Sequence, residues 1–61
     1  MIFIVRAHGT FVEMYEYEYG NLKHAMDHFN QEQTADLIWY DQGKERILAR
    51  KIDGKDLTIQ N

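Results

Sequence analysis

Residues 13–29 of the sequence, EMYEYEYGNLKHAMDHF, decide the fold because their hydrophobic pattern changes at Gly20. Before this glycine, side chains alternate with the period of two that is typical of a β-strand. After it, apolar side chains recur at the i, i+3, i+4 and i+7 spacing of an amphipathic helix. These apolar positions are Leu22, Ala25, Met26 and Phe29. The pattern therefore predicts a strand followed by a helix, which begins after Asn21, a residue type favoured as an N-cap, and fades between residues 30 and 33.

Upstream of this segment, residues 1–8 are rich in β-branched and aromatic side chains, which indicates a first strand. A two-residue His-Gly turn would join it to a second strand over residues 11–19. In that hairpin Phe3 lies opposite Met14, and both point to one surface of the sheet. Ile4 and the tyrosines of the second strand then point to the other surface.

Downstream of the helix, residues 35–40 and 45–52 have the composition of two further strands joined by a short turn. The Asp-Gly pair at 53–54 is a strong hairpin signal, and residues 55–60 can return as a short last strand. The order is strand, strand, helix, strand, strand, with a fifth strand as an option. We therefore predict a single α+β domain over residues 1–61, with one helix packed on one face of an antiparallel sheet of four to five strands.

One helix of about eleven residues is roughly 16 Å long and covers only one face of such a sheet. Both surfaces of the predicted first hairpin carry large apolar side chains, such as Phe3 on one and Ile4 on the other. Monomeric proteins seldom expose an apolar patch larger than a few hundred Å². We therefore expect the second face to meet either another copy of the chain, as in a homodimer, or a different protein.

The most informative candidate for such a contact is the second strand, with its alternating tyrosines and glutamates. Tyrosine is favoured at protein interfaces because its ring supplies contact area and its hydroxyl tolerates water. The candidate partner-binding residues are Glu13, Tyr15, Glu16, Tyr17, Glu18, Tyr19 and Trp39. This set is open to three interpretations: tyrosines packed around the helix beside solvated glutamates, a recognition strand for a basic partner or a dimer, and a mimic of a nucleic-acid strand.

Composition excludes several other classes of function. The 61 residues include no cysteine and no serine, so disulfides, four-cysteine zinc sites and the commonest nucleophiles are excluded. A formal net charge of −3 disfavours direct binding to nucleic acid and makes mimicry a weaker interpretation. The longest apolar run, residues 1–5, is too short for a membrane helix and is not preceded by basic residues. We expect a cytosolic protein that is not inserted in a membrane.

His24 and His28 are the only residues whose spacing suggests a metal site. At i and i+4 they share one face of the predicted helix, and Asp27 lies beside them. The glutamate of the His-Glu-x-x-His pattern is missing, because Ala25 follows His24. We therefore predict two solvated histidines and no metal or other cofactor, with a metal-dependent enzyme and a pH-sensitive contact as the alternatives.

The layout of the whole chain resembles small phage-encoded accessory proteins. The features that carry the resemblance are the leading hairpin, the Leu22-x-x-Ala25-Met26-x-x-Phe29 helix, and the stretch from Ala35 to Lys44 that runs into a final hairpin. The resemblance implies a compact polypeptide that binds and inhibits a host enzyme, toxin or defence factor. It assigns no individual residue to that role.

Taken together, these observations predict a small non-enzymatic protein-binding module that covers a functional surface of a host protein. A homo-oligomeric structural or regulatory protein is the alternative, and a nucleic-acid mimic is a weaker one.

Overall fold

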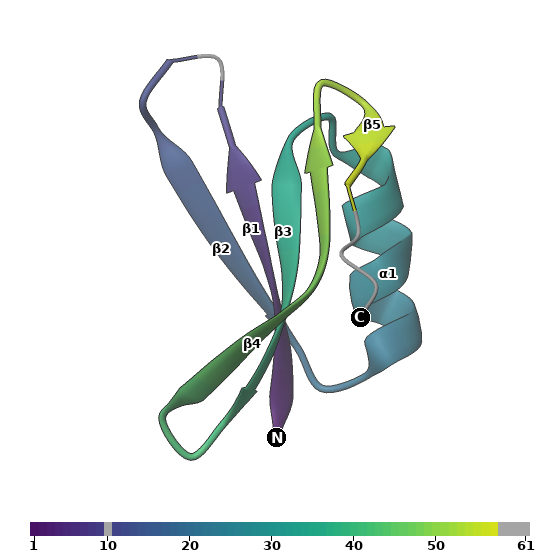
Figure 1. Ribbon diagram of the computed structural model, residues 1–61. Coiled ribbons are helices and arrows are strands. Elements are labelled where there is room, and N and C mark those ends of the chain that lie inside the picture. Colours follow the sequence, from purple (N-terminus) through teal and green to yellow (C-terminus); the bar gives the residue numbers. More distant parts are fainter. Residues whose placement is uncertain (10, 58–61) are drawn as a thin grey trace.

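The computed structural model describes residues 1–9 and 11–57, which form one helix and one antiparallel sheet of five strands (Figure 1). The elements are β1 (Ile2–His8), β2 (Met14–Tyr19), α1 (Leu22–Gln31), β3 (Ala35–Asp41), β4 (Lys44–Ile52) and β5 (Lys55–Asp56). The spatial order of the strands is β2-β1-β3-β4-β5. The predicted α+β architecture is confirmed. The last predicted strand is seen only as β5, and its positions 58–60 lie outside the described residues.

The helix begins and ends for identifiable local reasons. Asn21 is extended, and its side-chain oxygen accepts hydrogen bonds from the backbone N–H groups of Lys23 and His24 at 2.8 and 3.3 Å. This is the predicted N-cap. At the other end, the ammonium group of Lys51 in β4 lies 3.4 and 3.1 Å from two carbonyl oxygens of the last turn. A cation at this end satisfies carbonyl groups that have no partner within the helix.

Both later turns have the backbone that their sequences predict. Gln42 and Gly43 have φ angles of 50° and 81°, and Asp53 and Gly54 have φ angles of 52° and 81°. Two consecutive residues with positive φ are the mark of a type I′ turn, whose twist matches that of the flanking strands. These two turns set the β3–β4 and β4–β5 pairings, with an irregularity of register between Leu37 and Ile38.

The core lies between α1 and one face of the sheet, where the helix packs against β1, β2 and β3. Its buried members are Phe3, Val5, Ala7, Ala25, Phe29, Ala35 and Leu37. Of the predicted apolar stripe of the helix, Ala25 and Phe29 are buried, whereas Leu22 and Met26 stay 41% and 44% exposed. The helix therefore contacts the sheet along a narrower line than its hydrophobic pattern suggests.

The predicted register of the first hairpin is wrong. Phe3 lies opposite Tyr19 instead of Met14, five positions further along the chain. β1 ends at His8 and β2 begins at Met14, so the connection is longer than a two-residue turn. Because side chains alternate between the two faces, an odd shift moves every residue of the second strand to the other face. The tyrosines of β2 consequently lie on the same face as Phe3 and α1.

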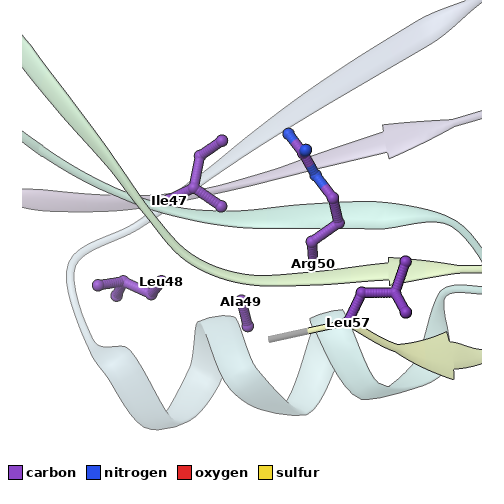
Figure 2. A pocket seen from close by; sticks show the side chains of 5 residues that line it. All are labelled: Ile47, Leu48, Ala49, Arg50 and Leu57. Atoms are coloured by element: carbon purple, nitrogen blue, oxygen red, sulfur yellow. The ribbon is translucent and has the colours of Figure 1, made fainter. Parts of the chain in front are cut away.

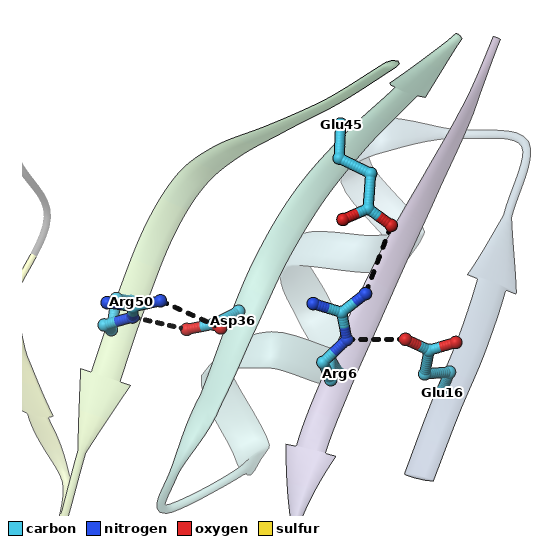
Figure 3. A network of polar contacts seen from close by, with 5 residues as sticks. All are labelled: Arg6, Glu16, Asp36, Glu45 and Arg50. Atoms are coloured by element: carbon cyan, nitrogen blue, oxygen red, sulfur yellow. Dashed lines mark hydrogen bonds and ion pairs between the residues drawn. The ribbon is translucent and has the colours of Figure 1, made fainter. Parts of the chain in front are cut away.

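The face opposite the helix is only in part the open apolar surface that the sequence predicts, since Ile47 on this face is 47% exposed. Ile4 and Ile38 lie opposite each other on this face and are 7% and 0% exposed. Figure 3 shows charged side chains gathered here instead. Arg6 in β1 binds Glu16 in β2 at 2.5 Å and, across β3, Glu45 in β4 at 3.2 Å. Ion-paired side chains with long apolar stems therefore take the place of a second helix.

Candidate protein-binding edge of the sheet

Among residues 1–9 and 11–57, β2 pairs with β1 and with no other strand, which makes it an edge strand. Over Met14–Tyr19, alternate backbone N–H and C=O groups therefore point away from the sheet. No proline lies in this strand, and none of its residues is Lys or Arg. Proline and lysine are common means of preventing a further strand from pairing with an edge. β2 thus has the backbone of a strand that can accept a partner strand.

The three tyrosines of β2 differ in exposure according to their distance from the helix. Tyr19 is partly buried against the core, whereas Tyr17 and Tyr15 are 43% and 51% exposed. In Figure 1, β2 and the loop end of the hairpin diverge from α1. The strand thus has one end that is fixed by the helix and one end that faces solvent.

His28 of α1 fixes the buried end of β2. Its Nδ1 atom lies 2.6 Å from the hydroxyl oxygen of Tyr19, and its Nε2 atom lies 2.7 Å from a carboxylate oxygen of Glu32. The ring of Tyr17 contacts the same imidazole edge-on, with 4.7 Å between ring centroids. A neutral imidazole satisfies both hydrogen bonds when Tyr19 donates to Nδ1 and Nε2 donates to Glu32. The arrangement connects the helix to the edge strand.

This role of His28 was not predicted from the sequence. His28 is partly buried and hydrogen-bonded, so the prediction of a solvated side chain is wrong for it, while His24 is exposed as predicted. Among the described residues, no group of three or more His, Cys, Asp or Glu side chains could hold a metal ion. The i, i+4 spacing of His28 and Glu32 is the sequence signal that could have revealed the contact.

The glutamates of β2 lie on the face opposite the tyrosines. Glu16 accepts a hydrogen bond from Arg6, and this bond is the main reason why the pKa of the guanidinium is raised above its ordinary value. Glu18 lies opposite Ile4 and has no ion-pair partner among residues 1–9 and 11–57. Of these two carboxylates at the sheet edge, that of Glu16 is therefore ion-paired within the described residues and that of Glu18 is not.

Apolar side chains are exposed at the loop end of the hairpin. Phe11 and Val12 are 84% and 99% exposed, and the neighbouring Met14 is 54% exposed. The loop is closed by a 2.9 Å hydrogen bond from the N–H of Gly9 to the carbonyl of Glu13. A Cβ atom at Gly9 would overlap the side chain of Glu13, which would then have to move. We call Phe11, Val12, Tyr15 and Tyr17 the exposed hairpin surface.

The structure brings together six of the seven predicted site residues and separates the seventh. Those from Glu13 to Tyr19 lie on or beside β2, although their side chains divide between two faces. Trp39 lies in β3, two strands away, and is partly buried against the core opposite Phe3. The exposed Phe11 and Val12, which the predicted register placed within the second strand, were not among the predicted site residues.

The opposite edge of the sheet has a small apolar hollow, shown in Figure 2. Its lining comes from β4 and the residue after β5: Ile47, Leu48, Ala49, Arg50 and Leu57. Its volume of about 50 Å³ is well below the several hundred Å³ of ordinary small-molecule sites. This hollow is therefore too small for such a site.

No protein-family model, curated protein or solved structure matches the chain. Within the part of the chain that the structure describes, no helix is long and apolar enough to cross a membrane. The basis for a functional proposal is therefore the geometry of β2 and its hairpin.

Proposed function

We propose that the protein is a small non-enzymatic module that binds another protein through β2 and the exposed hairpin surface. The observation that carries the proposal is that a free strand edge and exposed apolar side chains occur together in the β1–β2 hairpin. β2 offers unpaired backbone groups at the sheet edge, and the same hairpin holds apolar side chains that are 43% to 99% exposed. Partner strands that add to a sheet edge use both, since backbone hydrogen bonds give affinity and side chains give specificity.

Such binding needs no chemistry from the chain itself. A partner strand alongside β2 would be contacted by Tyr15 and Tyr17 on the helix-side face and by Glu16 and Glu18 on the other. If that strand belongs to a functional surface of a host enzyme or toxin, its occupation inhibits the partner by covering it. The surface differs from the one predicted by sequence, which was an uncovered sheet face.

Site-specific photo-crosslinking tests this proposal. A benzophenone amino acid replaces Tyr15 in one variant and Tyr40 in the matched control, whose aromatic side chain lies in β3 on the face opposite the helix. Both variants are irradiated in a lysate of the cells that express the protein, after circular dichroism has confirmed their fold. We expect a crosslinked protein at position 15 that unmodified protein in excess competes away, and none at position 40. Equal crosslinking from both positions, or from position 40 alone, would show that β2 is not the binding surface.

A further inference from the structure

The charges of β2 are all of one sign. Residues 7–22 contain three glutamates and no Lys or Arg. Two of these, Glu16 and Glu18, project from the same face of the strand at adjacent positions, about 7 Å apart along the chain. Arg6 partly neutralises the charge of Glu16, whereas Glu18 lies opposite the uncharged Ile4 of β1. The face of the edge strand opposite α1 is therefore a short acidic row.

This row disfavours pairing between two copies of the chain. When two copies of β2 pair antiparallel about a two-fold axis, the same face of each copy lies on the same side of the combined sheet. The residue numbers of two directly opposed residues must then add up to an even number. In two such registers, five residues of β2 pair with five residues of its copy. One, centred on Glu16, places this residue opposite its own copy, and the other, centred on Tyr17, places Glu16 opposite Glu18 twice. Like charges directly opposite each other are destabilising in a sheet.

The same row is complementary to a strand with basic side chains at alternate positions. Such a strand would place Lys or Arg opposite Glu16 and Glu18 and apolar side chains against Tyr15 and Tyr17, which are half exposed. We propose that the partner segment is an extended strand of another protein with this alternating basic and apolar pattern. The inference rests on the proposed function, and adds to it the chemical class of the partner.

Two peptides provide the test. One is acetyl-Thr-Lys-Val-Lys-Val-Lys-Val-Lys-Thr-amide, and the other has Glu in place of every Lys. Each is titrated into ¹⁵N-labelled protein at 50 mM NaCl while amide chemical shifts are recorded. We expect the Lys peptide to shift the signals of Met14–Tyr19 and to bind roughly five-fold more tightly than the Glu peptide, because each of two cross-strand ion pairs contributes about two- to three-fold. An increase to 300 mM NaCl should weaken the binding of the Lys peptide.

Two variants test whether the preference for the Lys peptide comes from the glutamates of β2. Glu16→Gln/Glu18→Gln should reduce the preference for the Lys peptide to below two-fold. Asp27→Asn, which removes a charge from an exposed position of α1, should leave it unchanged. Equal binding of the two peptides, no binding of either at 2 mM, shifts confined to other strands, or a preference that survives in the double variant would each overturn the inference. Continued crosslinking at position 15 in any of these cases would show that β2 binds a partner of another class. Loss of that crosslink as well would overturn the proposed function.

Discussion

The role of Arg6 gives the sharpest test of how the sheet face without a helix is stabilised. Its side chain is 23% exposed and binds the carboxylates of Glu16 and Glu45, which are 50% and 45% exposed. Beneath this network, Ile38 is fully buried. Two explanations are open: the ion pairs stabilise the face directly, or the apolar stem of Arg6 covers the isoleucines while its charge stays near solvent.

The two explanations predict different free energies of unfolding for Arg6→Met and Arg6→Ala. Exposed ion pairs contribute about 0.2–1 kcal/mol each, so Arg6→Met, which removes two pairs and keeps an apolar stem, should cost about 0.4–2 kcal/mol. Arg6→Ala also removes the Cγ and Cδ methylenes of the stem, of which about three quarters is buried. At ~0.8 kcal/mol per buried methylene, this adds roughly 1 kcal/mol. A chain of this size has a total stability of roughly 3–9 kcal/mol, so the difference is measurable.

Urea unfolding followed by the fluorescence of Trp39, the only tryptophan, measures both variants. Arg46→Met is a matched control, because Arg46 is an exposed residue of β4 with no ion-pair partner among the described residues, and it should change stability little. We expect Arg6→Ala to be the less stable of the two Arg6 variants by roughly 1 kcal/mol. If Arg6→Met is destabilised as much as Arg6→Ala, the stem does not cover the face and the reasoning is wrong.

Three further predictions follow from other contacts. Arg50→Met should destabilise more than Arg6→Met in the same urea assay, because it leaves its buried carboxylate partner without an ion pair. His28→Ala should cost roughly 1–3 kcal/mol, because it removes two hydrogen bonds and a ring contact that connect α1 to β2; an unchanged urea midpoint would contradict this. Glu16→Gln/Glu18→Gln should self-associate more than the wild type in sedimentation velocity, because it removes the repulsion between paired β2 strands; a wild type that already forms dimers through β2 would refute this account.

The sequence predicts the elements well because their signals are local. The change of period at Gly20 separates β2 from α1, and Asn21 caps the helix where its residue type indicates. The turn at Asp53 and Gly54 has the positive φ angles that an Asp-Gly pair favours. Each of these features depends on a few neighbouring residues, so no knowledge of the tertiary structure is needed to predict it.

Register is not local, and here the prediction was wrong. Phe11 and Val12 have the composition of strand residues, yet they lie in the connection between β1 and β2. β1 is a central strand, paired with β3 on its other side, and has the continuous apolar run Phe3–Ile4–Val5 that suits burial on both faces. Because β1 is apolar on both faces, its sequence does not indicate which alternate residues of the neighbouring strand face the helix. The hydrophobic pattern of β1 therefore could not decide on which face the tyrosines of β2 lie.

The exposure of the tyrosines also depends on where the helix lies, which composition does not encode. A six-residue strand spans about 20 Å and a ten-residue helix about 15 Å, but α1 diverges from β2 instead of following it. Tyr19 therefore reaches His28, while Tyr15, with the same residue type and on the same face, stays half exposed. Packing around the helix, one of the three interpretations of these tyrosines, describes Tyr19, whereas the exposure of Tyr15 leaves it available for the proposed recognition. Because the same strand contains both, a partner can bind its free end while the other end remains part of the core.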